Sequence, residues 1–194
     1  TITDNGRGIP VEKHPKYKKP ALELILTTLH AGGKFSAKNY QTAGGLHGVG
    51  SSVVNALSEE LIATVRRDGK EYRQTFSRGK PTSQLKMTGS AAKSTGTTIF
   101  FRPDHQIFKE IQFSSERIRR ALKTKAYLNP GLKLAFVDEK TGSSEQFHYE
   151  QGLSAYLREL LADRKLEIVG DEVFSISNNG EKTGDAEVKI TLVW

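Results

Sequence analysis

The sequence contains no cysteine and no long apolar run. The lack of cysteine excludes disulfide bonds and cysteine-ligated zinc within this chain. No stretch approaches the about 20 consecutive apolar residues that a membrane-spanning helix needs. The first residues also lack the charged and apolar regions of a secretory signal. We therefore expect a soluble cytoplasmic protein that does not contact a membrane.

Acidic residues are scarce relative to basic ones, because 29 Lys and Arg residues outnumber 22 Asp and Glu residues and give a formal charge of +7. This balance favours ligands that carry phosphate, which include nucleotides and nucleic acids. Many basic surfaces are only solvated, however. Composition alone therefore leaves open a nucleotide site, a nucleic-acid-binding module and a plain charged surface. A length of 194 residues fits one full domain and part of another.

Glycine is concentrated in two clusters, DNGRGIP at 4–10 and GGLHGVG at 44–50. The second cluster precedes an apolar-periodic stretch, which predicts a glycine loop that opens a helix and directs free N–H groups at an anion. A P-loop is excluded because no Lys lies between Gly44 and Ser52. A Rossmann fingerprint is excluded because the glycine spacing is reversed and follows a polar stretch. A helix-packing loop without a ligand is the alternative.

Asp4 lies where a strand is predicted to meet a glycine-rich turn. A buried carboxylate there would accept a hydrogen bond from an exocyclic amine, which selects adenine over guanine. Gly6 and Gly8 would let a flat ring approach the backbone. The alternative is an ordinary turn, because Asp, Asn and Gly fill turns in many proteins. On these residues alone the turn is favoured.

Hydrophobic periodicity predicts an α+β fold with a mostly antiparallel sheet and helices on one face. Hairpin turns are expected at Asp68-Gly69 and Thr141-Gly142. The second predicted helix should turn Val49, Val53, Val54 and Leu57 toward the core, and the third should turn Ile118, Ala121 and Leu122 inward. The helices are predicted at 21–29, 48–57, 115–126 and 153–161, and the strands at 1–3, 61–67, 70–76, 97–102, 132–138, 145–149 and 187–194.

The pattern of elements restarts after Glu150, and the last strands have no partners left in the sequence. We therefore predict one domain at 1–151 and the beginning of a second at 152–194. No internal repeat or low-complexity tract is evident.

Three ordered motifs carry a resemblance: DNGRG at 4–8, HAGGKF at 30–35 and GGLHGVG at 44–50. Together they resemble the ATPase region of the B subunits of DNA gyrase and topoisomerase IV, within the superfamily of Hsp90, sensor histidine kinases and MutL. The resemblance covers essentially the whole chain. It implies a Bergerat-type two-layer sandwich at 1–151 and the start of an S5-like transducer domain at 152–194.

The resemblance implies ATP and Mg²⁺ as cofactors. Asp4 would accept from the adenine amine, helped by Thr97 and an ordered water, while Ile9 and Pro10 pack on the ring. The N–H groups of 44–50 would wrap the phosphates, with added charge from Lys34 and His47. Tyr40 and His30 are further candidates near the nucleotide. The implied nucleotide-binding residues are Asp4, Gly8, Ile9, Pro10, Lys34, Tyr40, Gly44, Gly45, Leu46, His47, Gly48, Val49, Gly50 and Thr97.

Two arginines are implied as inhibitor-binding residues. Arg67 is similar to the arginine that stacks on aminocoumarin antibiotics in this family, and Arg7 would pair with a carboxylate near the adenine pocket. A solvated charge is the alternative for each. In the family, the general-base Glu and the metal-binding Asn precede the first motif. We therefore expect no catalytic residue and no metal ligand in this chain, and little ATP hydrolysis by it alone.

The implied function is that of the B subunit of a bacterial type II DNA topoisomerase, which uses ATP for DNA supercoiling, relaxation or decatenation. Its implied partners are the A subunit, double-stranded DNA and a second copy of the B subunit, with which it dimerises on ATP binding. Two alternatives stay open. One is a MutL- or Hsp90-like ATPase, which the HAGGKF motif argues against. The other is a nucleic-acid-binding module without ATPase activity, which predicts steeply salt-dependent DNA affinity and no protection by ATP.

Overall fold

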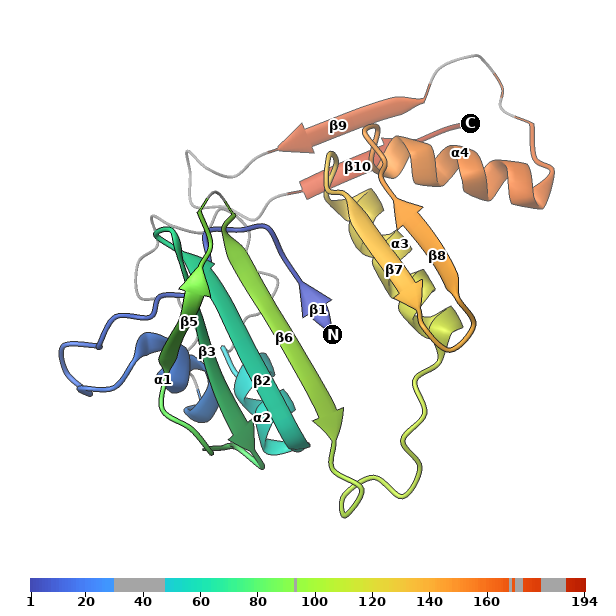
Figure 1. Cartoon of the computed structure of the whole chain (residues 1–194). Helices are drawn as coiled ribbons and strands as arrows, with labels where there is room; N and C mark the ends of the chain where they lie inside the picture. The colour runs from blue at the N-terminus through green and yellow to red at the C-terminus, as the bar shows by residue number, and fades with distance from the viewer. Residues whose placement is uncertain (30–47, 93, 168, 170–172, 179–187) are drawn as a thin grey trace. The chain divides into compact units, whose positions relative to one another are not determined.

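The computed structural model describes residues 1–29, 48–92, 94–167, 169, 173–178 and 188–194 (Figure 1). The HAGGKF motif and residues 44–47 of the second glycine cluster lie outside these ranges. The chain divides into two compact units, Thr1–Ile111 and Gln112–Trp194. This division lies earlier in the chain than the predicted domain boundary at 151/152, which stays a prediction.

The first unit is built on a six-stranded sheet in which every pairing is antiparallel. Asp68 and Gly69 have φ values of 51° and 72°, and they form the tight hairpin turn that the sequence predicts. The strands, with β3 pairing to both β4 and β5, are β1 (Ile2–Thr3), β6 (Gly96–Pro103), β2 (Ser58–Arg67), β3 (Lys70–Ser77), β4 (Lys80–Pro81) and β5 (Lys86–Ser90).

Two helices, α1 (Ala21–Thr27) and α2 (Gly50–Ala56), cover one face of this sheet (Figure 1). Every second residue of β2 faces them, so Leu61 and Val65 are both 0% exposed. Leu22 of α1 packs into the same apolar cluster. The predicted α+β arrangement, a mostly antiparallel sheet with helices on one face, is confirmed.

The prediction that Val53 and Val54 of α2 face the core is wrong, whereas Val49 and Leu57 are half-buried. Val53 and Val54 are 40% and 36% exposed, whereas Asn55 is 0% exposed. The reason lies in α1, because the last carbonyls of a helix have no partner within it. Asn55 Nδ2 donates to Leu26 O at 2.8 Å, and Ser51 Oγ donates to Ile25 O at 3.2 Å. The polar side of α2 therefore faces the end of α1.

The second unit contains a long helix, two hairpin strands, a further helix and a two-stranded sheet. Ser114 caps the first helix, since its Oγ accepts from Arg117 N at 3.3 Å. These elements are α3 (Ser115–Leu128), β7 (Leu134–Asp138), β8 (Ser143–Phe147), α4 (Leu153–Arg164), β9 (Phe174–Asn178) and β10 (Val188–Leu192).

Helix α3 buries its C-terminal end. Ala126 and Tyr127 are buried, whereas Ala121, which was predicted to face inward, is exposed. The Tyr127 ring stacks on Tyr149 with 3.8 Å between ring centroids, and its hydroxyl donates to Glu159 of α4. Burial, followed by the hydrogen bond to Glu159, raises the pKa of Tyr127. This contact joins α3 to α4 and explains why the buried end of α3 is the C-terminal one.

None of the helices within the described ranges has the length and apolar character that crossing a membrane demands.

Candidate functional site

Asp4 and Thr97 lie side by side because β1 pairs with β6. Asp4 N donates to Thr97 O at 2.9 Å, and Thr97 N donates back to Asp4 Oδ1 at 3.2 Å. Gly6 N donates to the same carboxylate oxygen at 2.8 Å. Oδ2 accepts no hydrogen bond from any described residue. One oxygen therefore fixes the carboxylate, and the other is available to a ligand.

The Thr97 side chain adds a donor beside this acceptor. Thr97 is 6% exposed, and its Oγ1 accepts a hydrogen bond from Ile9 N at 3.2 Å. A hydroxyl that accepts one bond still has its own hydrogen to donate. The pair thus offers one free acceptor and one free donor, and the predicted role of Asp4 and Thr97 at adenine stays a prediction.

Asp4 itself is exposed, so the expectation of a buried carboxylate is wrong. The cause is the position of β1, which forms one end of the strand order in the sheet. Ile9 and Pro10 are half-buried, and Ile9 packs against the core below. An apolar wall therefore accompanies the polar pair.

Two glycines let backbone segments approach each other closely at this site. Gly8 has φ +75°, and a Cβ there would lie 2.7 Å from Arg66 O. Gly96 has φ +139°, and a Cβ there would lie 2.0 Å from Asp4 O. Any side chain at either position would push backbone away. Sequence reasoning did not place Gly96 in the site, although a glycine at the start of a strand is a signal for close backbone approach.

Arg67 belongs to the same cluster. Its Nη1 donates to Gly8 O at 3.1 Å, and its Nε lies 3.5 Å from a Glu12 oxygen and 3.3 Å from an Asp68 oxygen. Its side chain is 28% exposed, so the alternative of a plain solvated charge is wrong. Arg7 is exposed, and its ion pair with a carboxylate stays a prediction.

The described part of the second glycine cluster contains three residues. Gly48 has φ +61°, Val49 is the residue before α2, and Gly50 begins that helix. A Cβ added at Gly50 would meet nothing within 4 Å. The other predicted phosphate-side residues lie outside the described ranges, and their roles stay predictions. They are Lys34, Tyr40, Gly44, Gly45, Leu46 and His47, together with His30.

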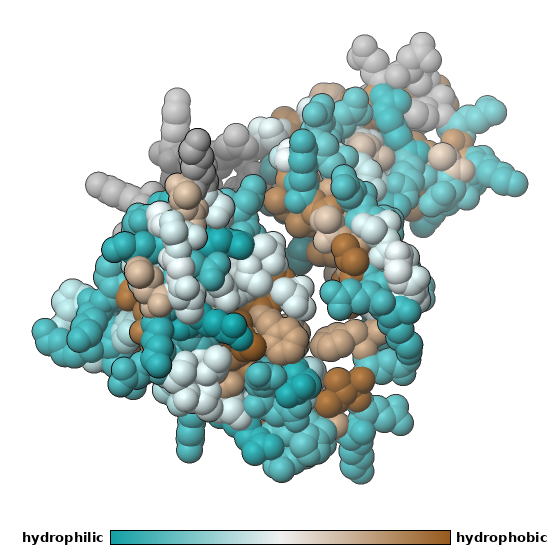
Figure 2. Space-filling view, in the orientation of Figure 1, coloured by the Kyte–Doolittle hydropathy of each residue, from teal (hydrophilic) through white to brown (hydrophobic). Residues whose placement is uncertain are grey.

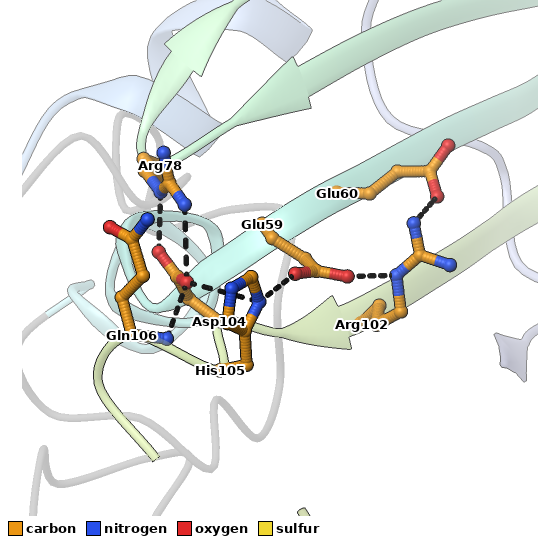
Figure 3. Close-up of polar contacts among 7 residues, drawn as sticks. All are labelled: Glu59, Glu60, Arg78, Arg102, Asp104, His105 and Gln106. Carbon is orange, nitrogen blue, oxygen red and sulfur yellow. Dashed lines mark hydrogen bonds and ion pairs between the residues drawn. The ribbon is translucent and has the colours of Figure 1, made fainter. Parts of the chain in front are cut away.

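A second polar cluster lies elsewhere in the first unit (Figure 3). Ligand atoms of Glu59, Asp104 and His105 all lie within 4.8 Å of one another, a spacing that would suit a metal ion. Both carboxylates already face guanidinium groups, however. Arg78 binds Asp104, and Arg102 binds Glu59. A metal cation there would be opposed by two permanent positive charges, so we interpret the cluster as an ion-pair network.

The hydrogen bonds and charges of this network lower the pKa values of its two carboxyl groups. The pKa of Glu59 is lowered, first by its hydrogen bond with His105, whose Nδ1 lies 2.7 Å away. The pKa of Asp104 is lowered by Arg78 and by the backbone N–H of Gln106 at 2.9 Å. Asp104 is 1% exposed. The network therefore holds a buried carboxylate in its charged form and joins the end of β6 to the start of β2.

Known proteins resemble this chain along its length. Residues 1–107 match the family model for histidine kinase-, DNA gyrase B- and HSP90-like ATPases. The B subunit of DNA topoisomerase 4 from Pseudomonas aeruginosa is 47% identical over 194 residues, which are 100% of this chain and 30% of that protein. The B subunit of DNA gyrase from Campylobacter jejuni is 45% identical over 193 residues, which are 100% of this chain and 24% of that protein.

One solved structure extends the likeness to three dimensions. It is the crystal structure of the 43K ATPase domain of Thermus thermophilus gyrase B in complex with an aminocoumarin. The TM-score is 0.82 at 38% sequence identity, and the match covers 97% of this chain and 46% of that chain. The chain therefore spans less than half the length of that solved chain. It spans less than a third of the length of the two relatives named before it.

Proposed function

Because the chain belongs to the family of histidine kinase-, DNA gyrase B- and HSP90-like ATPases, we propose that its Asp4–Thr97 cluster binds the adenine of ATP. We further propose that the chain is part of the B subunit of a bacterial type II DNA topoisomerase. Gyrase B and topoisomerase 4 B sequences align with the whole chain. The observation that carries the proposal is the free Asp4 oxygen next to the Thr97 hydroxyl.

The pair matches the edge of adenine. Adenine presents an exocyclic amine, which donates, next to a ring nitrogen, which accepts. Asp4 Oδ2 would take the amine and Thr97 would donate toward the ring nitrogen, while Ile9 and Pro10 contact the flat face. Guanine carries a carbonyl oxygen where adenine carries the amine, and a carboxylate repels it. The cluster should therefore discriminate between the two bases.

The phosphates extend, in this proposal, toward the glycine cluster before α2. The positive φ of Gly48 and the open space at Gly50 support a backbone that can approach a ligand closely. Lys34, Tyr40 and His47 complete the proposed phosphate side. The Thermus gyrase B domain was solved in complex with an aminocoumarin, and in this proposal inhibitors of that class would contact Arg67 and Arg7.

Magnesium does not fit the described residues around Asp4. Asp4 has one oxygen occupied by two N–H groups, and Glu12, the next acidic residue in the chain, faces Arg67. We assign neither a metal ligand nor a catalytic base within the described ranges. For the intact protein we propose the A subunit, duplex DNA and a second copy of the same chain as partners, and the cytoplasm as location.

Thermal unfolding with nucleotides tests the proposal. Millimolar ATP should raise the unfolding temperature of the 194-residue chain, because a ligand at 100 times its Kd adds about 2.7 kcal/mol to stability. GTP at the same concentration should give little shift. Novobiocin should compete with ATP for the site. Equal shifts with ATP and GTP, or none with ATP, would contradict the adenine assignment.

A matched pair of variants assigns the effect to one hydroxyl. Thr97→Val keeps the shape of the side chain but removes the hydroxyl, which is the proposed donor to adenine and also accepts from Ile9 N. The ATP-induced rise in unfolding temperature should therefore disappear. Thr97→Ser keeps the hydroxyl and should retain most of the shift. If Thr97→Val and Thr97→Ser responded alike to ATP, this role of the hydroxyl would be wrong.

A further inference from the structure

A strongly basic loop precedes α1, outside the nucleotide cluster. We define the basic loop as residues 13–20, KHPKYKKP, which hold four lysines and no acidic residue. Lys13, Lys16, Lys18 and Tyr17 are exposed, and Tyr17 is 52% exposed. The loop lies at the left of the first unit in Figure 1, and that edge of the surface is hydrophilic in Figure 2. It is an open, charged surface with one exposed tyrosine ring.

The basic loop has a fixed backbone. Lys13 and Pro20 form an isolated β-bridge at its base. His14 N donates to Lys19 O at 2.8 Å, and Lys18 N donates to His14 O at 2.9 Å. Lys18 adopts the left-handed region with φ 57°. The exposed lysines are therefore held on an ordered turn, which reduces the entropy lost when they bind a partner.

Among the described residues, one of the four lysines has an acidic partner and three have none. Lys19 pairs with Glu23 at 3.0 Å. Within the part of the chain that the structure describes, no carboxylate lies within 4.0 Å of the amino groups of Lys13, Lys16 or Lys18. Their positive charges thus face solvent around the Tyr17 ring. Lys16 Nζ lies 5.6 Å from the centroid of that ring.

The formal charge of the first unit also favours an anionic partner. Residues 1–111 hold 17 Lys and Arg against nine Asp and Glu, a formal charge of +8. Residues 112–194 hold 12 against 13, a formal charge of −1. The whole basic excess of the chain therefore belongs to the unit that carries the loop. Such a field attracts a polyanion over a distance of several ångströms.

We propose that the basic loop binds the phosphate backbone of duplex DNA. The proposal deepens the proposed function, since a topoisomerase acts on DNA. Lysines are point charges that suit phosphate oxygens and read no base, so the contact should be independent of sequence. The Tyr17 hydroxyl adds a donor that can reach a phosphate or a sugar. Duplex DNA fits better than an acidic peptide, because its charges are dense and regularly spaced.

Fluorescence anisotropy with a labelled duplex tests this surface. The 194-residue chain is titrated into DNA at about 50 mM and about 200 mM salt. Replacing Lys13, Lys16 and Lys18 together by Gln should weaken binding roughly tenfold or more at the lower salt. It should also reduce the slope of log K against log salt by about 2 to 3, since each phosphate contact contributes about 0.9.

The matched control removes the same charge elsewhere in the first unit. Lys70, Lys80 and Lys86 are exposed on β3, β4 and β5, and their joint replacement by Gln should change DNA affinity by less than about threefold. Equal losses in both triple variants would show a response to net charge alone and overturn the proposal. Tighter binding of the wild type to polyglutamate than to DNA would also overturn it, in favour of an acidic protein partner.

The nucleotide assay separates the two proposals. The loop variant should keep the ATP-induced shift in unfolding temperature, because none of its three lysines contacts Asp4 or Thr97. Loss of DNA binding with a preserved ATP shift supports the basic loop. A wild type that responds to ATP but does not bind DNA overturns the loop alone, whereas DNA binding without any ATP response overturns only the proposed function.

Discussion

The core of the first unit and the last elements of the second differ in how far they bury apolar side chains. Leu61 and Leu22 are 0% exposed, because a six-stranded sheet and two helices enclose them. In contrast, α4 has no buried residue, and Ile190 and Leu192 of the two-stranded β9–β10 sheet are 44% and 50% exposed. Two strands alone form only a marginally stable sheet. The number of elements packed together, more than apolar content, decides which residues become a core.

A cavity marks the looser packing of the second unit. It has a volume of about 340 Å³ and lies between α4 and β10. Its wall is mainly apolar, and the residues that line it are Leu153, Tyr156, Leu157, Lys189, Ile190 and Thr191. Deleting a side chain that borders such open space removes few contacts, whereas deleting one from a filled core leaves a new void.

The largest expected effect is therefore in the first unit. Leu61→Ala should lower the free energy of unfolding by about 2 to 5 kcal/mol, because the side chain is fully enclosed. The same truncation at Leu192, which is 50% exposed, should change it by less than about 1 kcal/mol. Urea unfolding followed by circular dichroism measures both. Similar losses for the two variants would remove the contrast between the units.

A smaller effect is expected where the second unit does bury a polar group. Tyr127 is 3% exposed, and both its hydroxyl and Lys123 Nζ donate to Glu159. Glu159→Ala leaves that buried hydroxyl without its acceptor and should cost about 1 to 3 kcal/mol. Glu167→Ala, at an exposed position, serves as the control in the same urea experiment. A change below about 0.5 kcal/mol for Glu159→Ala would show that α3 and α4 do not depend on this contact.

The smallest effect concerns acid stability of the first unit. Arg78 lowers the pKa of Asp104, so this carboxylate stabilises the fold at pH values above its unfolded pKa. The stability is lost as the pH falls through the lowered, folded pKa. In Arg78→Gln the pKa of Asp104 should rise, and unfolding should begin at a higher pH than in the wild type. Circular dichroism during an acid titration from pH 6 downward measures the shift, and identical titration curves would contradict this role for Arg78.

Local patterns were enough to predict most elements of the sheet. Alternating apolar residues defined β2, and Asp68-Gly69 defined the hairpin to β3. The strand β5 (Lys86–Ser90) was not predicted, since it is mostly exposed and has little apolar alternation. Edge strands of this kind gain their order from the neighbouring strand, and a short window of sequence does not contain that neighbour.

The site residues stay a prediction drawn from short motifs, and the geometry of Asp4 and Thr97 could not be predicted from the sequence. Asp4 and Thr97 are separated by 93 positions, and only the register of β1 with β6 brings them together. Gly96 was missed because the group that a Cβ there would meet, the Asp4 carbonyl, lies far away in the sequence, directly after β1. The orientation of α2 depended on the carbonyl groups at the end of α1, which Asn55 satisfies. In each case the missing information was tertiary.

The most direct test of the central claim is isothermal titration of ATP into the wild type and Asp4→Asn. An amide can turn its own N–H toward the adenine amine, so the variant loses the charged acceptor that Oδ2 provides. We predict a loss of about 2 kcal/mol, roughly 30-fold in Kd, with a circular dichroism spectrum like that of the wild type. Unchanged ATP affinity in Asp4→Asn would contradict the account.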